Sequence, residues 1–484
     1  MNVQIARLFG VIVVLFTLLI AATSWSTVFT ADSLDKNPKN RRALIRDARV
    51  ERGLILARDG TVLARSVARG TKNNRFFTRT YPTGPLFSHP VGYSFIVNGR
   101  KGLEQSRNDA LAGEEDEFQS LLSQLENQTR EGFDVQTNLD PAGTKAALAG
   151  LGGRKGGVVA IEPKTGKVRV MVSVPDYDAN QVPDEFNRLN RDPNKPLFNR
   201  TTQELYPPGS TFKVVTASAA LDSGKFTPES IVDGSSPKTI SGAPLANAGG
   251  QDFGPVTLTD ALTNSVNTVW AEVGERIGRR TLLEYMDRYG FGEDPKLDYP
   301  GDQMIPSGIL NAKGRLLRGD AGFDTGRVAI GQGGLEGEIR ASPMQMALVA
   351  AAVGNGGRLM KPRLTDKVVR KDGRLKERIE PDLQAEVMKK ETADQMRDMM
   401  ARVVEEGTGT AAALSGVKLA GKTGTAEIGA AREFTQPWFI GFAPVDDPKI
   451  AVAVTVERQP GSASGGETAG PIAKQVLETL LPGE

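Results

Sequence analysis

The chain of 484 residues is long enough for two or three domains, each with its own hydrophobic core. Its 60 Lys and Arg residues are balanced by 58 Asp and Glu residues, so its charge does not indicate a nucleic-acid partner. Cysteine is absent and histidine occurs once, as His89, which excludes disulfides, thiolate nucleophiles and histidine-rich or cysteine-based metal sites. We therefore expect no metal and no cofactor, and any acyl chemistry needs a base other than imidazole.

The first feature along the chain is an apolar segment at residues 8–30 without a charged side chain. It is long enough to cross a bilayer, so we expect one membrane helix preceded by a short cytoplasmic tail at residues 1–7. A cleaved signal peptide is the alternative, because small residues occupy positions 21–24, but the apolar run is longer than a usual signal core. Flanking positive charges leave the orientation open, because long domains are translocated largely regardless of them.

Residues 31–150 predict a small mixed domain. In residues 52–64, apolar and polar side chains alternate on both sides of an Asp-Gly turn, a pattern that is typical of a β-hairpin. Helices are expected at residues 116–128 and 141–151. This region contains no catalytic constellation, so we expect a pedestal that lifts the next domain off the membrane.

Residues 151–484 predict a larger α+β domain. Two strands at 158–161 and 168–174 form a hairpin, and a helix is expected from 342 to 354. Glycine-rich segments at 241–255 and 312–326 are expected to line or cover a site. The end of the chain predicts an antiparallel meander and a closing amphipathic helix, at residues 417–428, 438–443, 450–456 and 471–481.

A candidate nucleophile and base occur in the stretch that begins at Ser210. Two prolines and a glycine at 207–209 end the preceding element, and the residues that follow contain no helix breaker. Ser210 and Lys213 are three apart and share one helical face, which places a hydroxyl beside an amine. The pattern alone is weak, because Ser-x-x-Lys occurs three more times, at Ser33/Lys36, Ser235/Lys238 and Ser415/Lys418.

Two further motifs follow Ser210 in order. The first is Ser-x-Asn, with Ser265 and Asn267, and the second is Lys-Thr-Gly, with Lys422, Thr423 and Gly424. The order Ser-x-x-Lys, Ser-x-Asn, Lys-Thr-Gly is the signature of penicillin-recognising serine acyltransferases. This signature is highly specific, because all three motifs must occur together in one order.

The chemistry of acyl transfer assigns a role to the nucleophile and the base. The Ser210 N–H at the start of a helix suits an oxyanion, and its hydroxyl becomes a good nucleophile only when a neighbour removes the proton. Lys213 can remove that proton if burial or the nearby positive charge of Lys422 lowers its pKa. Asn267 is expected to orient Lys213, and Ser265 to pass a proton to the departing amine.

The last motif is expected to bind substrate. It lies on a predicted strand, and Gly424 has no side chain, so an extended peptide can pair against that edge. Lys422 with the hydroxyls of Thr423 and Thr425 suits a terminal carboxylate, and the Thr425 N–H can complete the oxyanion hole. The combined site favours acyl transfer from a peptide with a free C-terminus.

The chain resembles the class B penicillin-binding proteins, which are peptidoglycan D,D-transpeptidases, and within them the actinobacterial penicillin-binding protein A group. Beyond the three motifs, the resemblance covers segments along nearly the whole chain: Arg52-Gly53, Gly102-Leu103-Glu104, Asn199-Arg200, Gly331-Gln332-Gly333, Gly407-Thr408-Gly409 and Trp438-Phe439-Ile440-Gly441-Phe442-Ala443-Pro444. It implies an α+β multidomain protein: a membrane helix, a dimerisation-like pedestal at 31–150, and a transpeptidase domain at 151–484. That domain would combine an antiparallel sheet flanked by helices with an all-α lobe.

The resemblance also implies a reaction and partners. Ser210 would attack the D-Ala-D-Ala amide of a peptidoglycan stem peptide, D-Ala would leave, and an amine of a neighbouring stem peptide would take the acyl group. β-Lactams would acylate the same serine. The bulk of the chain would lie on the extracellular side of the cell membrane, acting in wall synthesis during growth and division beside a polytopic glycan polymerase.

Neighbouring families differ from this chain in identifiable residues. A bifunctional class A protein needs a Glu-Asp-x-x-Phe-x-x-His pattern, which His89 cannot supply because it precedes any acidic-Phe stretch, such as the one at 115–118. A class A β-lactamase needs a Glu-x-x-Leu-Asn motif that is absent, and Asn267 argues against a class D enzyme, which usually has Ser-x-Val. A D,D-carboxypeptidase and a non-catalytic penicillin-binding sensor or scaffold remain open as alternatives.

Overall fold

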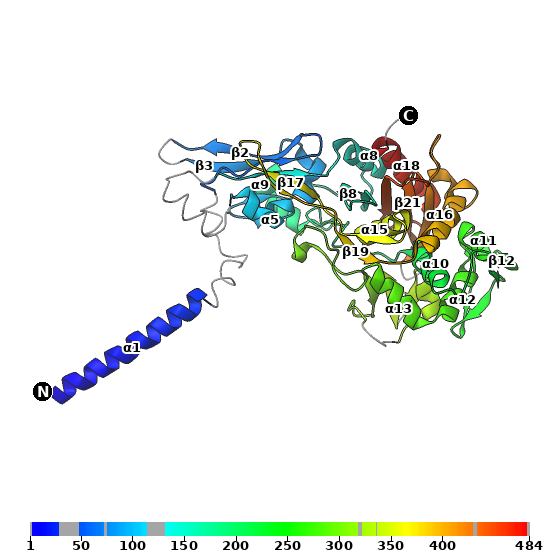
Figure 1. The fold of residues 1–484 in the computed structure, drawn as a ribbon, viewed down its shortest axis with the longest axis horizontal. Helices are drawn as coiled ribbons and strands as arrows, with labels where there is room; N and C mark the ends of the chain where they lie inside the picture. The colour runs from blue at the N-terminus through cyan, green and yellow to red at the C-terminus, as the bar shows by residue number, and fades with distance from the viewer. Residues whose placement is uncertain are drawn as a thin grey trace.

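We describe a computed structural model of the chain, which places residues 2–28, 48–71, 75–113, 131–317, 322–334, 336–428 and 433–481. Its first element is helix α1, Asn2–Val28, drawn in dark blue in Figure 1. Within the described residues, α1 contains the single stretch long and apolar enough to cross a membrane, Val3–Ser26. The helix begins earlier than the predicted span, so most of the expected tail at 1–7 is helical. The predicted end at residue 30 lies outside the described residues.

The pedestal contains a six-stranded sheet in the order β18-β17-β6-β1-β2-β3. The predicted hairpin is present: strand β1 (Ile55–Leu56) pairs antiparallel with β2 (Val62–Arg69) around the Asp-Gly turn. The other strands of this sheet are β3 (Phe76–Thr80), β6 (Asp134–Thr137), β17 (Thr365–Val369) and β18 (Leu375–Arg378). The predicted helix at 116–128 lies outside the described residues.

Two strands of the pedestal sheet come from far along the sequence. Strand β17 pairs antiparallel with β6 and carries β18 on its outer side, although both follow the predicted pedestal by more than 200 residues. The pedestal predicted from the sequence covers residues 31–150 only. Short strands such as these carry little local information about their partner, because pairing depends on the face that tertiary packing buries.

The larger domain is built on an antiparallel sheet in the order β20-β21-β22-β7-β8. The predicted hairpin and the predicted meander are both present and join edge to edge through β22 and β7. The strands are β7 (Gly156–Ile161), β8 (Val168–Val174), β20 (Ala420–Ile428), β21 (Phe434–Ala443) and β22 (Ile450–Val456), with β23 (Gln459–Pro460) paired to β21.

Both faces of this sheet are covered by helices (Figure 1). Helices α8 (Pro141–Leu151) and α18 (Gly470–Leu480) pack on one face, and α15 (Pro343–Gly354) packs on the other, so all three predicted helices are confirmed. Alternate residues of β7 divide between the two cores: Val158 belongs to the α8–α18 side and Val159 to the α15 side. Successive side chains of a strand point to opposite faces of the sheet. Because both faces are buried here, the strand is apolar throughout.

A second lobe is mainly helical and carries the Ser-x-x-Lys and Ser-x-Asn motifs at its border with the sheet. Its helices are α10 (Lys213–Asp222), α11 (Leu258–Thr263), α12 (Asn267–Ile277), α13 (Arg279–Arg288), α14 (Thr325–Ala329) and α16 (Lys390–Glu405). Short strand pairs interrupt the helices, so the lobe is not purely α. These strands are β9 (Ile231–Asp233), β10 (Lys238–Ile240), β11 (Ala243–Leu245), β12 (Pro255–Thr257), β13 (Gly308–Leu310), β14 (Gly333–Gly334) and β15 (Gly337–Arg340).

The remaining regular elements are short and connect these units. They are α4 (Ser88–Val91), α5 (Leu103–Ser106), α6 (Asn108–Leu111), α9 (Val182–Arg191), α17 (Gly465–Thr468), β4 (Ser94–Phe95), β5 (Gly99–Arg100), β16 (Arg358–Met360) and β19 (Leu383–Glu386). Single 3-10 turns begin at residues 84, 179, 209, 248, 301 and 410.

Candidate active site

Ser210 lies in a 3-10 turn, Gly209–Phe212, that leads directly into α10. Gly209 has a φ of 52°, a value that favours glycine, and the Thr211 hydroxyl donates to the Pro208 carbonyl at 2.8 Å. The predicted helix start is therefore confirmed, with a tighter first turn. The Ser210 side chain is half-buried, and its hydroxyl has no hydrogen-bond partner among the described residues.

Lys213 is fully buried one turn later, and its amine faces the Ser-x-Asn motif. Its Nζ donates to the Ser265 carbonyl at 2.7 Å and to Asn267 Oδ1 at 2.7 Å, and lies 3.2 Å from Ser265 Oγ. Asn267 therefore holds Lys213, as the sequence predicts. The predicted pairing of Lys213 with the Ser210 hydroxyl is not formed as a hydrogen bond in this structure.

The Ser-x-Asn loop has a strained backbone conformation, and hydrogen bonds with the neighbouring segment at 246–247 hold it in place. Ser265 has a φ of 56°, and Asn267 is the first residue of α12. Asn267 Nδ2 donates to the Ala246 carbonyl at 3.2 Å, and the Asn247 side chain accepts from the amide of Thr268. The first glycine-rich segment, 241–255, therefore borders the site as predicted. Part of the second, at 318–321, lies outside the described residues.

Lys422 reaches the same serine from the sheet. It is fully buried on β20, and its Nζ donates to Ser265 Oγ at 3.0 Å and to the Thr423 carbonyl at 3.1 Å. Strand β20 is the edge strand on this side of the sheet, as the substrate-pairing expectation requires. Ser265 thus stands between two lysines that are more than 200 residues apart in sequence.

Burial lowers the pKa of both amines, and at Lys213 a neighbouring positive charge adds to it. Burial lowers the pKa of Lys213 well below its ordinary value, and the positive charge of Lys422 lowers it further. Burial alone lowers the pKa of Lys422 to about 7. The charge of Lys422 thus adds to burial at Lys213, which favours the neutral form of that amine. A neutral amine at this position can act as the base for the Ser210 hydroxyl, which lies three residues earlier in the chain.

Gly424 permits a close approach between β20 and the Ser210 turn. A Cβ at Gly424 would lie 2.7 Å from the Pro208 carbonyl oxygen and 3.2 Å from the Thr211 amide. The strand therefore passes directly over the nucleophile turn. This contact adds a second reason for glycine here, beyond the predicted freedom to pair with a substrate strand.

Two residues that sequence reasoning left without a role fix the other sides of this turn. Gly331 has a φ of 79°, its carbonyl accepts the Gly209 amide at 3.0 Å, and an added Cβ would lie 1.8 Å from the Gly209 oxygen. Trp438 is fully buried opposite Gly424 on β21, and its indole N–H donates to the Pro207 carbonyl at 3.0 Å. Both belong to segments that carry the family resemblance, which was the available signal.

The predicted substrate-binding hydroxyls already have protein partners. Thr423 Oγ1 lies 2.6 Å from Thr408 Oγ1, and Thr425 Oγ1 accepts the Gly465 amide at 3.0 Å. Thr408 belongs to the Gly-Thr-Gly segment and was not predicted at the site. Each threonine hydroxyl retains a lone pair or proton for a further contact, because a hydroxyl has one donor and two acceptor positions.

Comparison with known families decides what this arrangement is. The profile described as "Penicillin binding protein transpeptidase domain" matches residues 156–478, and the profile of the "Penicillin binding protein A dimerisation domain" matches residues 52–135. This chain is a class B penicillin-binding protein. The resemblance predicted from sequence is therefore confirmed, together with the expected fold class.

Curated relatives are similar in sequence to this penicillin-binding protein over its full length. It is 33% identical to the peptidoglycan D,D-transpeptidase PbpA of Mycolicibacterium smegmatis, over 99% of both chains, and 33% identical to PbpA of Mycobacterium tuberculosis, over all of both chains. The structure is similar to the ceftriaxone acyl-enzyme complex of M. tuberculosis penicillin-binding protein A, with a TM-score of 0.80 and 30% identity over 90% of this chain and 100% of that one. It is also similar to a D,D-transpeptidase domain from Eggerthella lenta, with a TM-score of 0.76 and 31% identity over 89% and 98%.

Proposed function

We propose that this chain is a peptidoglycan D,D-transpeptidase that acts through an acyl-enzyme on Ser210. The observation that carries the proposal is the pair of buried lysines on Ser265, one of which, Lys213, lies three residues after Ser210, whose hydroxyl has no hydrogen-bond partner within the described part of the chain. Relatives named as peptidoglycan D,D-transpeptidases and β-lactam acyl-enzyme complexes of similar structures support it. The enzyme acts in cell wall synthesis during growth and division and is inhibited covalently by β-lactams.

In the acylation step, Ser210 Oγ attacks the carbonyl carbon between the two terminal D-Ala residues of a stem peptide. The Ser210 proton moves to Lys213, whose pKa is held well below its ordinary value by burial and by the charge of Lys422, which favours its role as the base. The tetrahedral intermediate then collapses, the C–N bond breaks, and free D-Ala leaves with a proton relayed from Lys213 through Ser265 Oγ. The product is a peptidyl ester on Ser210.

Deacylation reverses these proton movements with a different amine. An amine of a second stem peptide gives up a proton along the same Ser265–Lys213 route and attacks the ester carbonyl. The ester C–O bond then breaks, Lys213 returns a proton to Ser210 Oγ, and the new amide is the cross-link. The amides of Ser210 and Thr425 are our candidates for the oxyanion hole. Lys422, Thr423 and Thr425 are our candidates for the terminal carboxylate, and the backbone at Gly424 for strand pairing with the peptide.

The domain roles follow from this chemistry. We place the tail at 1–7 in the cytoplasm, the membrane helix at 8–30, the pedestal at 31–150 and the transpeptidase domain at 151–484, with β17 and β18 contributed back to the pedestal. Because stem peptides lie outside the membrane, the bulk of the chain is extracellular. A polytopic glycan polymerase is the proposed partner through α1 and the pedestal, and in-membrane crosslinking that captures no polymerase would contradict this.

The test uses the full-length chain in detergent and a fluorescent penicillin. Wild type should give a stable covalent band, Ser210→Ala should give none, and Ser265→Ala should label slowly. A folded wild type without a band would overturn the active-site assignment and favour a scaffold. Product analysis on a stem pentapeptide with an added amine separates the transpeptidase, which forms a cross-linked dimer, from a carboxypeptidase, which releases only D-Ala and the shortened peptide.

A further inference from the structure

The carboxamide of Asn267 has contacts on both of its ends. Its Oδ1 accepts from Lys213 Nζ at 2.7 Å, and its Nδ2 donates to the Ala246 carbonyl at 3.2 Å. The second proton of Nδ2 has no acceptor among the described residues. The side chain can therefore hold the lysine and still donate one hydrogen bond to a substrate.

The direction of this carboxamide matters most when Lys213 is neutral, because a neutral amine does not attract Oδ1 by its charge. The two shortest contacts of Lys213 Nζ are those to the Ser265 carbonyl and to Asn267 Oδ1, both at 2.7 Å. A neutral amine has two protons, so these two acceptors leave its lone pair free to take a proton from a hydroxyl. A carboxamide that turned over would present its NH₂ group, which donates to the lone pair and competes with the hydroxyl.

The Ala246 carbonyl opposes that turn, and the next residue, Asn247, fixes the carbonyl in place. Asn247 is buried, and its Nδ2 donates to the carbonyls of Gly234 and Gln251 at 3.0 and 2.9 Å. Its Oδ1 accepts from the amide and the hydroxyl of Thr268 at 3.0 and 3.2 Å. Both protons and both lone pairs of this side chain are therefore used, and a buried, fully satisfied amide holds the segment around it rigidly.

Asn247 also caps helix α12 from outside. Asn267 and Thr268 are the first two residues of α12, and the residue at the N-cap position is Val266, whose side chain has no acceptor. The first amides of a helix need an acceptor that the helix does not supply. Asn247 Oδ1 accepts the Thr268 amide, which is the bond that a capping Asn usually makes to its own helix. Asn247 thus fixes Asn267 twice, through the carbonyl at its side chain and through the backbone of the next residue.

The segment that carries Asn247 is anchored along α12. The segment includes the hairpin of β10 and β11, and Lys238 of β10 forms an ion pair with Glu272 of α12. Ser241, in the turn of the hairpin, donates from its amide and its hydroxyl to Glu275 of the same helix, at 2.8 and 2.7 Å. The carbonyl that binds the Asn267 side chain is therefore held in place relative to the first turn of α12.

We propose that Asn247 is a positioning residue of the acylation reaction, which keeps the oxygen of the Asn267 carboxamide toward Lys213 while that amine is neutral. Because Asn247 is buried, it acts through Asn267 and not by contact with the substrate. This inference rests on the proposed function, since it assigns Asn247 a part in the acylation of Ser210.

The test is a double-mutant cycle on the full-length chain in detergent, with the rate constant for acylation by a fluorescent penicillin as the readout. Asn247→Ala is measured alone and together with Asn267→Ala. Asn138→Ala is the matched control, because Asn138 is also buried and donates to a backbone carbonyl, that of Arg363 at 3.1 Å, but lies between β6 and α8. Thr268→Val keeps the shape of the side chain, removes one hydrogen bond to Asn247, and replaces Asn247→Ala in the cycle if that variant does not fold. Thermal unfolding shows which variants are folded.

We expect Asn247→Ala to slow acylation at least about tenfold when Asn267 is present, and less than about twofold in the Asn267→Ala background. Thr268→Val should slow it about threefold, again only when Asn267 is present. Asn138→Ala should change the rate less than about twofold. Equal slowing with and without Asn267, or slowing no greater than that of the control, would overturn the proposal while the wild type still acylates. A folded wild type that does not acylate would instead overturn the proposed function, and this inference with it.

Discussion

The side-chain amines of Lys213 and Lys422 meet at one hydroxyl, with Nζ atoms 3.2 and 3.0 Å from Ser265 Oγ. Both lysines are fully buried, so neither charge is screened by bulk water. The pKa of Lys213 falls well below its ordinary value because of its burial and the charge of Lys422. The motif order seen in the sequence becomes, in space, a hydrogen-bonded route from Lys213 through Ser265 to Lys422.

Removing the charge of Lys422 should move the pH dependence of acylation. The rate constant for penicillin acylation should rise with pH as Lys213 loses its proton and fall as Lys422, with a pKa of about 7, loses its own. In Lys422→Met the rising limb should shift to higher pH, because one cause of the low Lys213 pKa is gone. Lys422→Arg keeps the charge and is the control. An unchanged rising limb in Lys422→Met would contradict the coupling.

A negative charge at position 267 should also shift the rising limb of the acylation pH profile to higher pH. Asn267 Oδ1 accepts from Lys213 Nζ at 2.7 Å, so Asn267→Asp places a carboxylate against the amine and raises its pKa, typically by about 1–3 units. The rising limb of the acylation profile should move up by a similar amount, while the variant stays folded. Asn264→Asp, exposed in the same loop, should leave the profile in place.

Alanine at Gly331 should displace the nucleophile turn. The new Cβ would lie 1.8 Å from the Gly209 oxygen at a φ of 79°, so the turn that carries Ser210 must move. We expect acylation to slow about 100-fold, the usual cost of a misplacement near 1 Å. Gly334→Ala is the matched control, because nothing lies within 4 Å of its added Cβ. Equal rates in the two variants would show that the contact does not position Ser210.

Trp438→Phe should separate the hydrogen bond from the packing of the indole. Its N–H donates to Pro207, whereas the equally buried Trp270 has an N–H without a partner in the described chain. Losing the Trp438 bond costs about 0.5–1.5 kcal/mol, so acylation should slow by up to about tenfold. Trp270→Phe removes an unsatisfied donor and should leave the acylation rate unchanged. If the acylation rate fell equally in Trp438→Phe and Trp270→Phe, the effect would come from the packing of the indole rings and not from the hydrogen bond.

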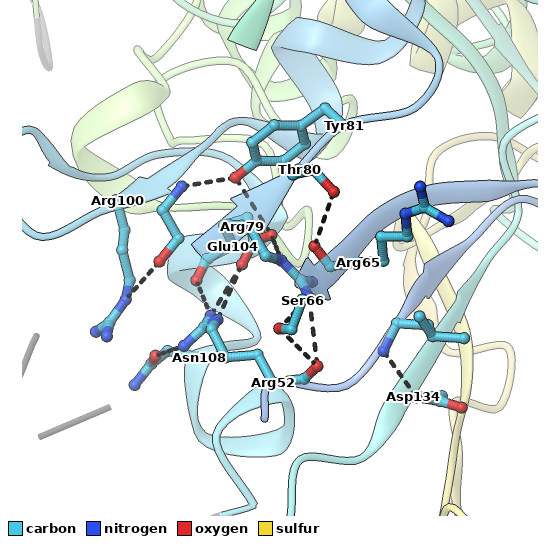
Figure 2. Close-up of polar contacts among 12 residues, drawn as sticks. Arg52, Arg65, Ser66, Arg79, Thr80, Tyr81, Arg100, Glu104, Asn108 and Asp134 are labelled. Carbon is cyan, nitrogen blue, oxygen red and sulfur yellow. Dashed lines mark hydrogen bonds and ion pairs between the residues drawn. The ribbon is translucent and has the colours of Figure 1, made fainter. Parts of the chain in front are cut away.

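Glu104→Gln should destabilise the pedestal strongly. Burial raises the pKa of Glu104, but the charges and hydrogen bonds of Arg79 and Arg52, which converge on it in Figure 2, outweigh this and hold its pKa below the ordinary value. Removing the charge leaves two arginines without a counterion, at a cost of about 3–5 kcal/mol in the free energy of unfolding.

The control for Glu104 is Glu51→Gln, whose 3.3 Å pair with Lys371 is exposed and worth about 0–1 kcal/mol. Chemical denaturation of the full chain measures both variants. Because the folded pKa of Glu104 is depressed, its stabilisation should be present above the unfolded pKa and disappear as pH falls through the folded one. Equal, small losses in the two variants would contradict a structural role for this network.

Local sequence was sufficient for most elements of the fold. The strands at 158–161 and 450–456, and the helices at 141–151 and 342–354, were predicted because apolar period, proline at a first turn and capping residues are properties of neighbours in sequence. The joining of β17 to the pedestal sheet was not, because it depends on a partner more than 200 residues away.

The sequence by itself determined the family of this protein and the order of its three catalytic motifs, because those residues are fixed by the chemistry of acyl transfer and stand in short recognisable patterns. Only the tertiary structure decided that Lys213 and Lys422 share Ser265, and that Gly331 and Trp438 hold the nucleophile turn. It also decided that Arg52 and Arg79 share one carboxylate. Charge balance and close contact are properties of distances in space, and spacing along the chain does not contain them.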